Sequence, residues 1–183
     1  MDRLQRVSIL LFLNEKMKEK GSWCGETHIQ KTVYFLQQLE KVPLDYDFVL
    51  YIHGPFSFDL RDELTAMRAD GLIALKINPI PYGPSLEVTE YGKEIISRFP
   101  KTVGNHKESI EKITNILGDK GVAELERLAT ALYIIKKIKQ DSIDKNPAEW
   151  IHELKPHISI EEAETAIEEA EKYMDYKVVD HSN

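Results

Sequence analysis

The sequence predicts a mostly helical α+β fold, in which a winged-helix-like N-terminal domain (residues 1–102) is followed by a C-terminal helical region (residues 103–176). Apolar residues recur at helical spacing through most of the chain. Two short runs of strand character flank a proline-rich loop at 78–85, and the second half carries only the helical period. A chain of 183 residues can bury a sizeable core without disulfide bonds. We expect residues 177–183 to form a frayed tail.

Two helices are expected first. One spans about residues 2–19, and Gly21 ends it. The other begins at Thr27, because Thr27 and Gln30 have the spacing of a capping box. The predicted apolar stripes are Leu4, Val7, Leu10, Leu11 and Met17 in the first helix, and Ile29, Val33, Leu36 and Leu39 in the second.

A strand and a third helix follow. Alternating side chains predict a strand over residues 46–53, which Gly54-Pro55 breaks, with Phe48 and Ile52 on the face opposite Tyr51 and His53. Ser57 is expected to cap the third helix, which Gly71 ends. The buried positions of this helix are predicted to be Leu60, Leu64 and Met67.

Two further strands, over 72–77 and 86–88, enclose the proline-rich loop. Helices followed by two strands with a long loop between them are the layout of a winged helix. The candidate wing residues are therefore Pro79, Pro81, Tyr82 and Gly83. Thr89 is expected to cap a fourth helix, which Pro100 ends. The buried positions of that helix are predicted to be Tyr91, Ile95 and Phe99.

The C-terminal region is helical by pattern, and we expect it to pack on the N-terminal domain or on a second subunit. Helices are expected to begin at Asn105 (with Glu108 in a capping box), at Val122, at Asn146-Pro147 and at Ser159 (with Glu162). The helix from Val122 to Lys139 has the strongest periodicity. Its stripe from Leu125 to Ile138, together with an alanine face at Ala163, Ala166 and Ala170, suggests a homodimer formed through the C-terminal helices. The short helix before Pro156 is expected to bury Trp150, Ile151 and Leu154.

Two segments carry a family resemblance. They are His28-Ile29-Gln30-Lys31-Thr32-Val33-Tyr34-Phe35-Leu36-Gln37 and Tyr51-Ile52-His53-Gly54-Pro55-Phe56-Ser57, followed by Leu60, Leu64 and Asp70-Gly71-Leu72-Ile73. The stretch resembles the YwgA-like uncharacterised proteins of bacteria and archaea and is more distantly similar to Panacea antitoxin-type domains. The resemblance implies a winged-helix-like fold and no catalytic residues. The antitoxin-type relatives act through protein contacts with a toxin or as adaptors, which is an analogy because fold alone does not define function.

A winged helix also suggests DNA binding, and the charges weigh against it. The third helix carries Arg61 and Arg68 against four acids, so its net charge is 2 − 4 = −2, whereas a helix that contacts phosphates is expected to be basic. The chain as a whole has a net charge of −7, most of it in residues 103–183. About 16 residues separate helices two and three, far more than the turn of a helix-turn-helix. A DNA-binding transcriptional regulator is therefore the alternative, and a protein-interaction module is the first hypothesis.

No enzyme motif accounts for the chain. His152 and His157 are five residues apart with Pro156 between them, so they do not share a helix face as zinc-protease ligands do. Cys24 near His28 lacks a third group, and a buried, idle thiol is the simpler interpretation. We therefore expect no catalytic residue, no cofactor and no metal.

The sequence also bears on location. A single cysteine cannot form an internal disulfide bond, which favours a reducing compartment such as the cytoplasm. No apolar run has the length of a membrane span, and no signal peptide is expected.

The candidate interaction surface is the segment that ends the first predicted strand, together with two arginines of the third helix. A turn and a helix cap explain Gly54, Pro55 and Ser57, but they do not explain Tyr51 or His53. The full set of candidate residues is Tyr51, His53, Pro55, Phe56, Ser57, Arg61 and Arg68.

Overall fold

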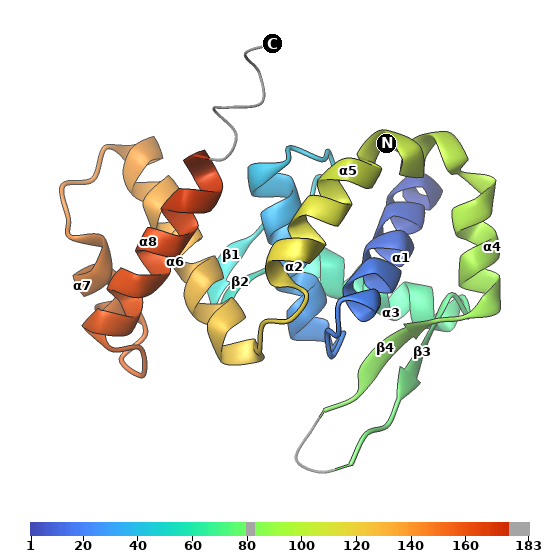
Figure 1. Cartoon of the computed structure of the whole chain (residues 1–183), viewed down its shortest axis with the longest axis horizontal. Helices are drawn as coiled ribbons and strands as arrows, with labels where there is room; N and C mark the ends of the chain where they lie inside the picture. The colour runs from blue at the N-terminus through green and yellow to red at the C-terminus, as the bar shows by residue number, and fades with distance from the viewer. Residues whose placement is uncertain (80–82, 176–183) are drawn as a thin grey trace. The chain divides into compact units, whose positions relative to one another are not determined.

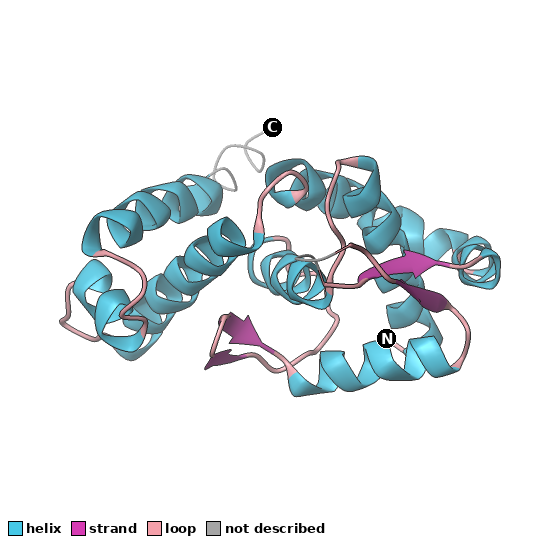
Figure 2. Cartoon of the chain, turned by 90° about the horizontal axis from the view of Figure 1, so that it is seen from below, coloured by secondary structure: helices cyan, strands magenta, loops and turns pink. Residues whose placement is uncertain are grey.

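The computed structural model describes residues 1–79 and 83–175. Within these ranges the chain forms eight helices and two antiparallel pairs of short strands, which confirms the prediction of a mostly helical α+β protein (Figure 2). The chain divides into two compact units. Unit 1 comprises residues 1–48 and 57–121, and unit 2 comprises residues 49–56 and 122–183. The domain boundary expected at 102–103 lies within a helix, Pro100–Leu117.

Unit 1 is built around its first helix. Its elements are α1 (Arg3–Glu19), α2 (Glu26–Leu39), α3 (Phe58–Ala69), β3 (Ile73–Lys76), β4 (Ser85–Val88), α4 (Glu90–Arg98) and α5 (Pro100–Leu117). Helix α1 packs against α4, α5 and strand β4, and α2 packs against α3 and α5 (Figure 1). The core of the unit includes Val7, Leu10, Leu11, Met17, Val33, Phe35, Leu36, Leu60 and Ile113.

The starts of the first two helices differ in how they are capped. Helix α1 begins with a capping box in which the Asp2 carboxylate accepts a hydrogen bond from the backbone N–H of Gln5 (2.8 Å). The capping box predicted at Thr27 and Gln30 is wrong, because α2 already begins at Glu26 and Gly25 is its N-cap. The Gln30 side chain instead bonds to the backbone of Ser57, a partner that is 27 residues away.

Helix α3 and the strand pair after it match the prediction closely. Ser57 caps α3 by accepting a hydrogen bond from the N–H of Leu60, and Gly71 follows the helix with a φ of +72°, a conformation that glycine adopts without strain. Strands β3 and β4 pair antiparallel, with Ile73 opposite Val88. Of the candidate wing residues, Pro79 and Gly83 are exposed, and Pro81 and Tyr82 lie outside the described residues.

The junction of α4 and α5 confirms one prediction and corrects another. Thr89 caps α4, and the helix ends at Arg98, just before Pro100, as expected; Pro100 is also the first residue of α5. Proline is accepted at that position because its missing N–H would have no helical partner there. Helix α5 runs through the start predicted at Asn105, so the capping box with Glu108 is also wrong.

Unit 2 combines a hairpin with three helices. Strands β1 (Val49–Tyr51) and β2 (Gly54–Phe56) pair antiparallel, and α6 (Val122–Asp141), α7 (Pro147–Leu154) and α8 (Ile160–Asp175) follow. The strand predicted over 46–53 is therefore too long, and Gly54-Pro55 starts the second strand of a hairpin. Helix α6 packs against β2, α7 and α8. Asn146 caps α7 and Ser159 caps α8, as predicted.

Three apolar positions predicted to be inward are exposed, namely Leu4, Tyr91 and Leu154. All three lie in the first or last turn of their helices, where helical periodicity continues but the packed neighbours end. Across residues 1–79 and 83–175, no helix is both long and apolar enough to cross a membrane.

Candidate interaction site

The hairpin of unit 2 presents a tight two-residue turn. Tyr51 pairs with Gly54, and Ile52 and His53 form the turn between them. Gly54 has a φ of +82°, which favours glycine because a side chain would be strained there. The sequence Tyr-Ile-His-Gly therefore reverses the chain over a short distance and projects two consecutive side chains from the turn.

A buried lysine holds the backbone of this turn. The ammonium group of Lys155, which follows the last residue of α7, donates hydrogen bonds to the carbonyl oxygens of Tyr51 and Ile52. Burial lowers the pKa of Lys155, and the charge of Glu126 opposes that shift. Because the lysine occupies both carbonyls, the turn is fixed by a contact between segments that are more than a hundred residues apart.

Glu126 of α6 lies at the centre of the polar contacts. Its carboxylate is buried, and its Oε1 lies 3.7 Å from the ammonium nitrogen of Lys155. Two largely exposed imidazoles flank the same carboxylate: Nδ1 of His53 lies 3.3 Å from Oε2, and Nε2 of His157 lies 3.0 Å from Oε1. A buried carboxylate needs partners to offset the loss of water, and this arrangement supplies them.

Apolar side chains surround the turn on its exposed side. Ile52 is 61% exposed, and Val49 and Tyr51 are both 47% exposed. The Tyr51 ring also contacts the half-buried Phe56, with 5.6 Å between ring centroids. The hairpin thus carries exposed apolar groups on a backbone that its own unit holds in place.

The structure separates the predicted surface into two parts. Tyr51, His53, Pro55 and Phe56 belong to unit 2, and Ser57, Arg61 and Arg68 belong to unit 1. Pro55 is buried in the hairpin. Ser57 is also buried, and it is used by the α3 cap and by the Gln30 side chain. The exposed members of the unit 2 group are therefore Tyr51 and His53, the two residues that turn and cap signals leave unexplained.

Arg61 and Arg68 both line a groove of unit 1. A cavity of about 140 Å³ lies between α3 and the β3–β4 pair, and both arginines line it together with Leu75 and Glu26. Arg61 is also engaged locally: its guanidinium contacts Asp62 at 2.9 Å and lies over the Phe58 ring. The groove combines two cations with one carboxylate, so its positive charge is modest.

The sequence did not point to Glu126, Lys155 or His157 as partners of the turn. Glu126 follows Leu125, a residue of the apolar stripe of α6. A charged residue next to this buried stripe is the sequence signal that could have indicated a role for Glu126. His157 drew attention in the sequence only together with His152, because the two resemble a pair of zinc ligands that their spacing excludes. Within residues 1–79 and 83–175, no group of three histidine, cysteine or acidic side chains is arranged to hold a metal ion.

The comparisons with known proteins give no further identification. No protein-family model matches the chain, and no curated protein matches its sequence.

Proposed function

We propose that the chain is a non-enzymatic protein-interaction module, antitoxin-like or adaptor-like, which presents the turn of the β1–β2 hairpin to a protein partner. The observation that carries the proposal is the combination of exposed Tyr51 and Ile52 side chains with a backbone fixed by Lys155. A segment already held in one conformation loses little entropy on binding. Exposed aromatic and aliphatic groups then gain free energy when a partner covers them.

The chemistry of the turn describes the expected partner surface. Ile52 and Tyr51 suit an apolar depression, and the exposed imidazole of His53 suits a polar or acidic group at its rim. We therefore expect a protein surface with an apolar pocket bordered by a hydrogen-bond acceptor.

Two tyrosines of equal exposure provide a matched test. Tyr51 in the hairpin and Tyr91 in α4 are each 47% exposed. Tagged wild-type protein, Tyr51→Ser and Tyr91→Ser should be used to capture proteins from an extract of the native host. The proposal predicts a protein that wild type and Tyr91→Ser retain and Tyr51→Ser loses. Equal capture by all three proteins would remove the hairpin from the interaction.

We also propose that unit 1 has the winged-helix-like fold that the family resemblance implies. The element order of unit 1, in which the β3–β4 pair follows α1, α2 and α3, supports the proposal of a winged-helix-like domain with that pair as its wing. The YwgA-like relationship and the more distant antitoxin-type relationship rest on the residues quoted above. The hydrogen bonds between the buried Gln30 and Ser57 support the proposed family relationship, because they join the two segments that carry the resemblance, residues 28–37 and 51–57.

DNA binding by unit 1 is the second candidate, and Arg61 and Arg68 in one groove favour it. The acids of α3, among them Asp59, Asp62 and Glu63, weigh against it. A labelled random duplex should be titrated from low to physiological salt. Binding that weakens steeply with salt and is lost in Arg61→Ala/Arg68→Ala would favour the regulator. The absence of binding at low salt would exclude it.

A homodimer through the C-terminal helices remains a proposal as well. Ala163, Ala166 and Ala170 are buried within the chain, where α8 packs on α6 and α7. The dimer would therefore use the outer faces of these helices. Light scattering over a concentration series tests it, and a constant monomer mass would exclude it. The single buried cysteine, Cys24, is consistent with the proposed cytoplasmic setting.

A further inference from the structure

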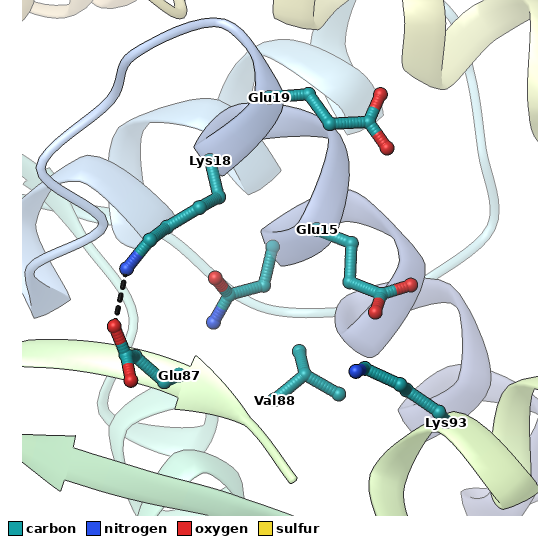
Figure 3. A pocket seen from close by; sticks show the side chains of 7 residues that line it. Glu15, Lys18, Glu19, Glu87, Val88 and Lys93 are labelled. Atoms are coloured by element: carbon teal, nitrogen blue, oxygen red, sulfur yellow. Dashed lines mark hydrogen bonds and ion pairs between the residues drawn. The ribbon is translucent and has the colours of Figure 1, made fainter. Parts of the chain in front are cut away.

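A pocket in unit 1 contains two polar side chains that have no hydrogen-bond or ion-pair partner among residues 1–79 and 83–175. It has a volume of about 330 Å³ and lies between α1, β4 and α4. Figure 3 shows Lys18 of α1 reaching Glu87 of β4 on one side, and Glu15 of α1 and Lys93 of α4 extending toward the space on the other. Its size is within the range of small-molecule sites.

Most charges at the pocket have a protein partner. The Lys18 ammonium lies 2.5 Å from Glu87, and Glu87 also contacts Lys76. Glu19 is paired with Lys16, and Lys93 with Glu90, each at 2.7 Å. Within the part of the chain that the structure describes, Glu15 has neither an ion pair nor a side-chain hydrogen bond. Burial raises the pKa of Glu15, although Lys93 opposes that shift.

The neighbouring Asn14 is the second polar group at the pocket without a side-chain partner in the described residues. The residue is only 4% exposed and lines the same pocket. Its backbone carbonyl accepts a contact from the thiol of Cys24, but its side-chain amide forms no hydrogen bond to any residue in 1–79 or 83–175. The amide is not among the sealed polar groups of the described residues, so a ligand in the pocket would reach it and form the hydrogen bonds that the chain does not supply.

We propose that this pocket binds a small molecule that carries a primary ammonium group, held by the carboxylate of Glu15 and the side-chain carbonyl of Asn14. The lining contains three carboxylates and two ammonium groups, a net charge of 2 − 3 = −1, which favours a cation. An ammonium group has three donors and can serve both acceptors at once. Val88 provides an apolar wall for the carbon chain of the ligand.

The ligand that carries the ammonium group is either an alkylamine or an amino acid. An amino acid also carries a carboxylate, and Lys93 is the group that would bind it. Among the described residues, the ion pair of Lys93 is with the exposed Glu90, a weak surface contact, and its charge also attracts Glu15 at longer range. It is therefore able to turn to a carboxylate on the ligand, as an amino acid would offer. The inference is independent of the hairpin interaction, because all of its residues lie in unit 1.

The experiment is an NMR titration of the full chain with n-butylamine, L-alanine and butyrate, three probes of similar size. We expect at least one ammonium-bearing probe to shift the backbone amide signals of Glu15, Val88 and Lys93, and butyrate to leave them unchanged. Stronger binding of alanine than of butylamine would assign the amino-acid source. No shift at millimolar concentration, or an equal response to butyrate, would overturn the proposal.

Two further measurements separate binding from folding. Glu15→Gln should weaken binding roughly tenfold or more, since a charged hydrogen bond is lost, whereas Glu161→Gln on α8 should leave it unchanged. In the wild type, binding should fall as the pH drops and Glu15 takes up a proton, at a higher pH than for an ordinary carboxylate. The other charged groups that face Glu15 are Lys16, Lys18, Glu19, Glu87, Glu90 and Lys93. Unchanged affinity in Glu15→Gln would contradict the assignment.

Discussion

The ammonium nitrogen of Lys155 lies 3.7 Å from the Glu126 carboxylate, and both side chains are buried. The lysine also satisfies the carbonyls of Tyr51 and Ile52, so one cation serves a helix and a turn from distant parts of the sequence. Each charge offsets the lost hydration of the other. The pair therefore links the stability of unit 2 to the shape of the proposed interaction surface.

Lys155→Met should destabilise the protein by about 3 kcal/mol, because a buried carboxylate loses its lysine counter-charge and two carbonyls lose the ammonium donor. Lys172→Met, at an exposed lysine of α8, should change the free energy of unfolding by less than about 0.5 kcal/mol. Urea unfolding of both variants provides the comparison. Adding Glu126→Leu to Lys155→Met should recover part of the loss, since no unpaired charge then remains. Additive losses in the double variant would show that the two side chains are not coupled.

Gln30 provides a second test in which structure and sequence predict different results. Its side-chain amide donates to the Ser57 carbonyl and accepts from the Ser57 N–H, both at 2.9 Å, inside the core of unit 1. Gln30→Ala should therefore cost about 2 kcal/mol, because the buried N–H of Ser57 loses its acceptor, while the Ser57 carbonyl keeps the helical bond from the N–H of Arg61. Thr27→Ala should cost little, since Thr27 is not the N-cap of α2. A larger loss for Thr27→Ala in thermal or urea unfolding would restore the capping box expected from the sequence.

The elements that the sequence predicted correctly are those with local signals. Ser57, Thr89 and Asn146 each cap a helix through a backbone N–H two or three residues away, so the cap can be recognised within a short window. Pro100 shows the limit of such signals. The proline correctly predicts the end of α4, but the same residue also begins α5, and nothing within a short window of sequence indicates that a second helix starts there.

The candidate site was predictable only in part, for a physical reason. Tyr51 and His53 stood out because turn chemistry did not account for them. Their partners could not be predicted, since Glu126 is 73 residues from His53, and Lys155 is more than a hundred residues from the turn. A lysine that follows a helix end is ordinarily a solvated cation. Only the packing of α7 beside the hairpin turns it into a buried donor.

The burial of His28 predicts a dependence of stability on pH. Burial lowers the pKa of His28 below its ordinary value of 6.5. Below about pH 6.5 the imidazole of the unfolded chain binds a proton that the imidazole of the folded chain does not bind. The contribution of His28 to the free energy of unfolding is therefore complete above that pH and is lost as the pH falls toward the pKa of the folded state. The imidazole signals in an NMR titration give the folded value directly. A His28 ring that titrates at or above the ordinary value would contradict the prediction, and His28→Gln should flatten the acid side of the stability profile.

Two helical glycines should respond to the same substitution with opposite signs. A Cβ at Gly92 in α4 would lie 2.4 Å from the carbonyl oxygen of Leu72 and 2.8 Å from Cγ1 of Val88. The backbone oxygen cannot give way without moving strand β3, so Gly92→Ala should destabilise the protein by about 2 kcal/mol. Gly104 in α5 has no atom within 4 Å of the added Cβ, and Gly104→Ala should stabilise it by about 0.5–1 kcal/mol, because alanine is the better helix former. Urea midpoints that shift in the same direction for both variants would mean that α4 does not approach β3 and β4 as closely as the structure shows.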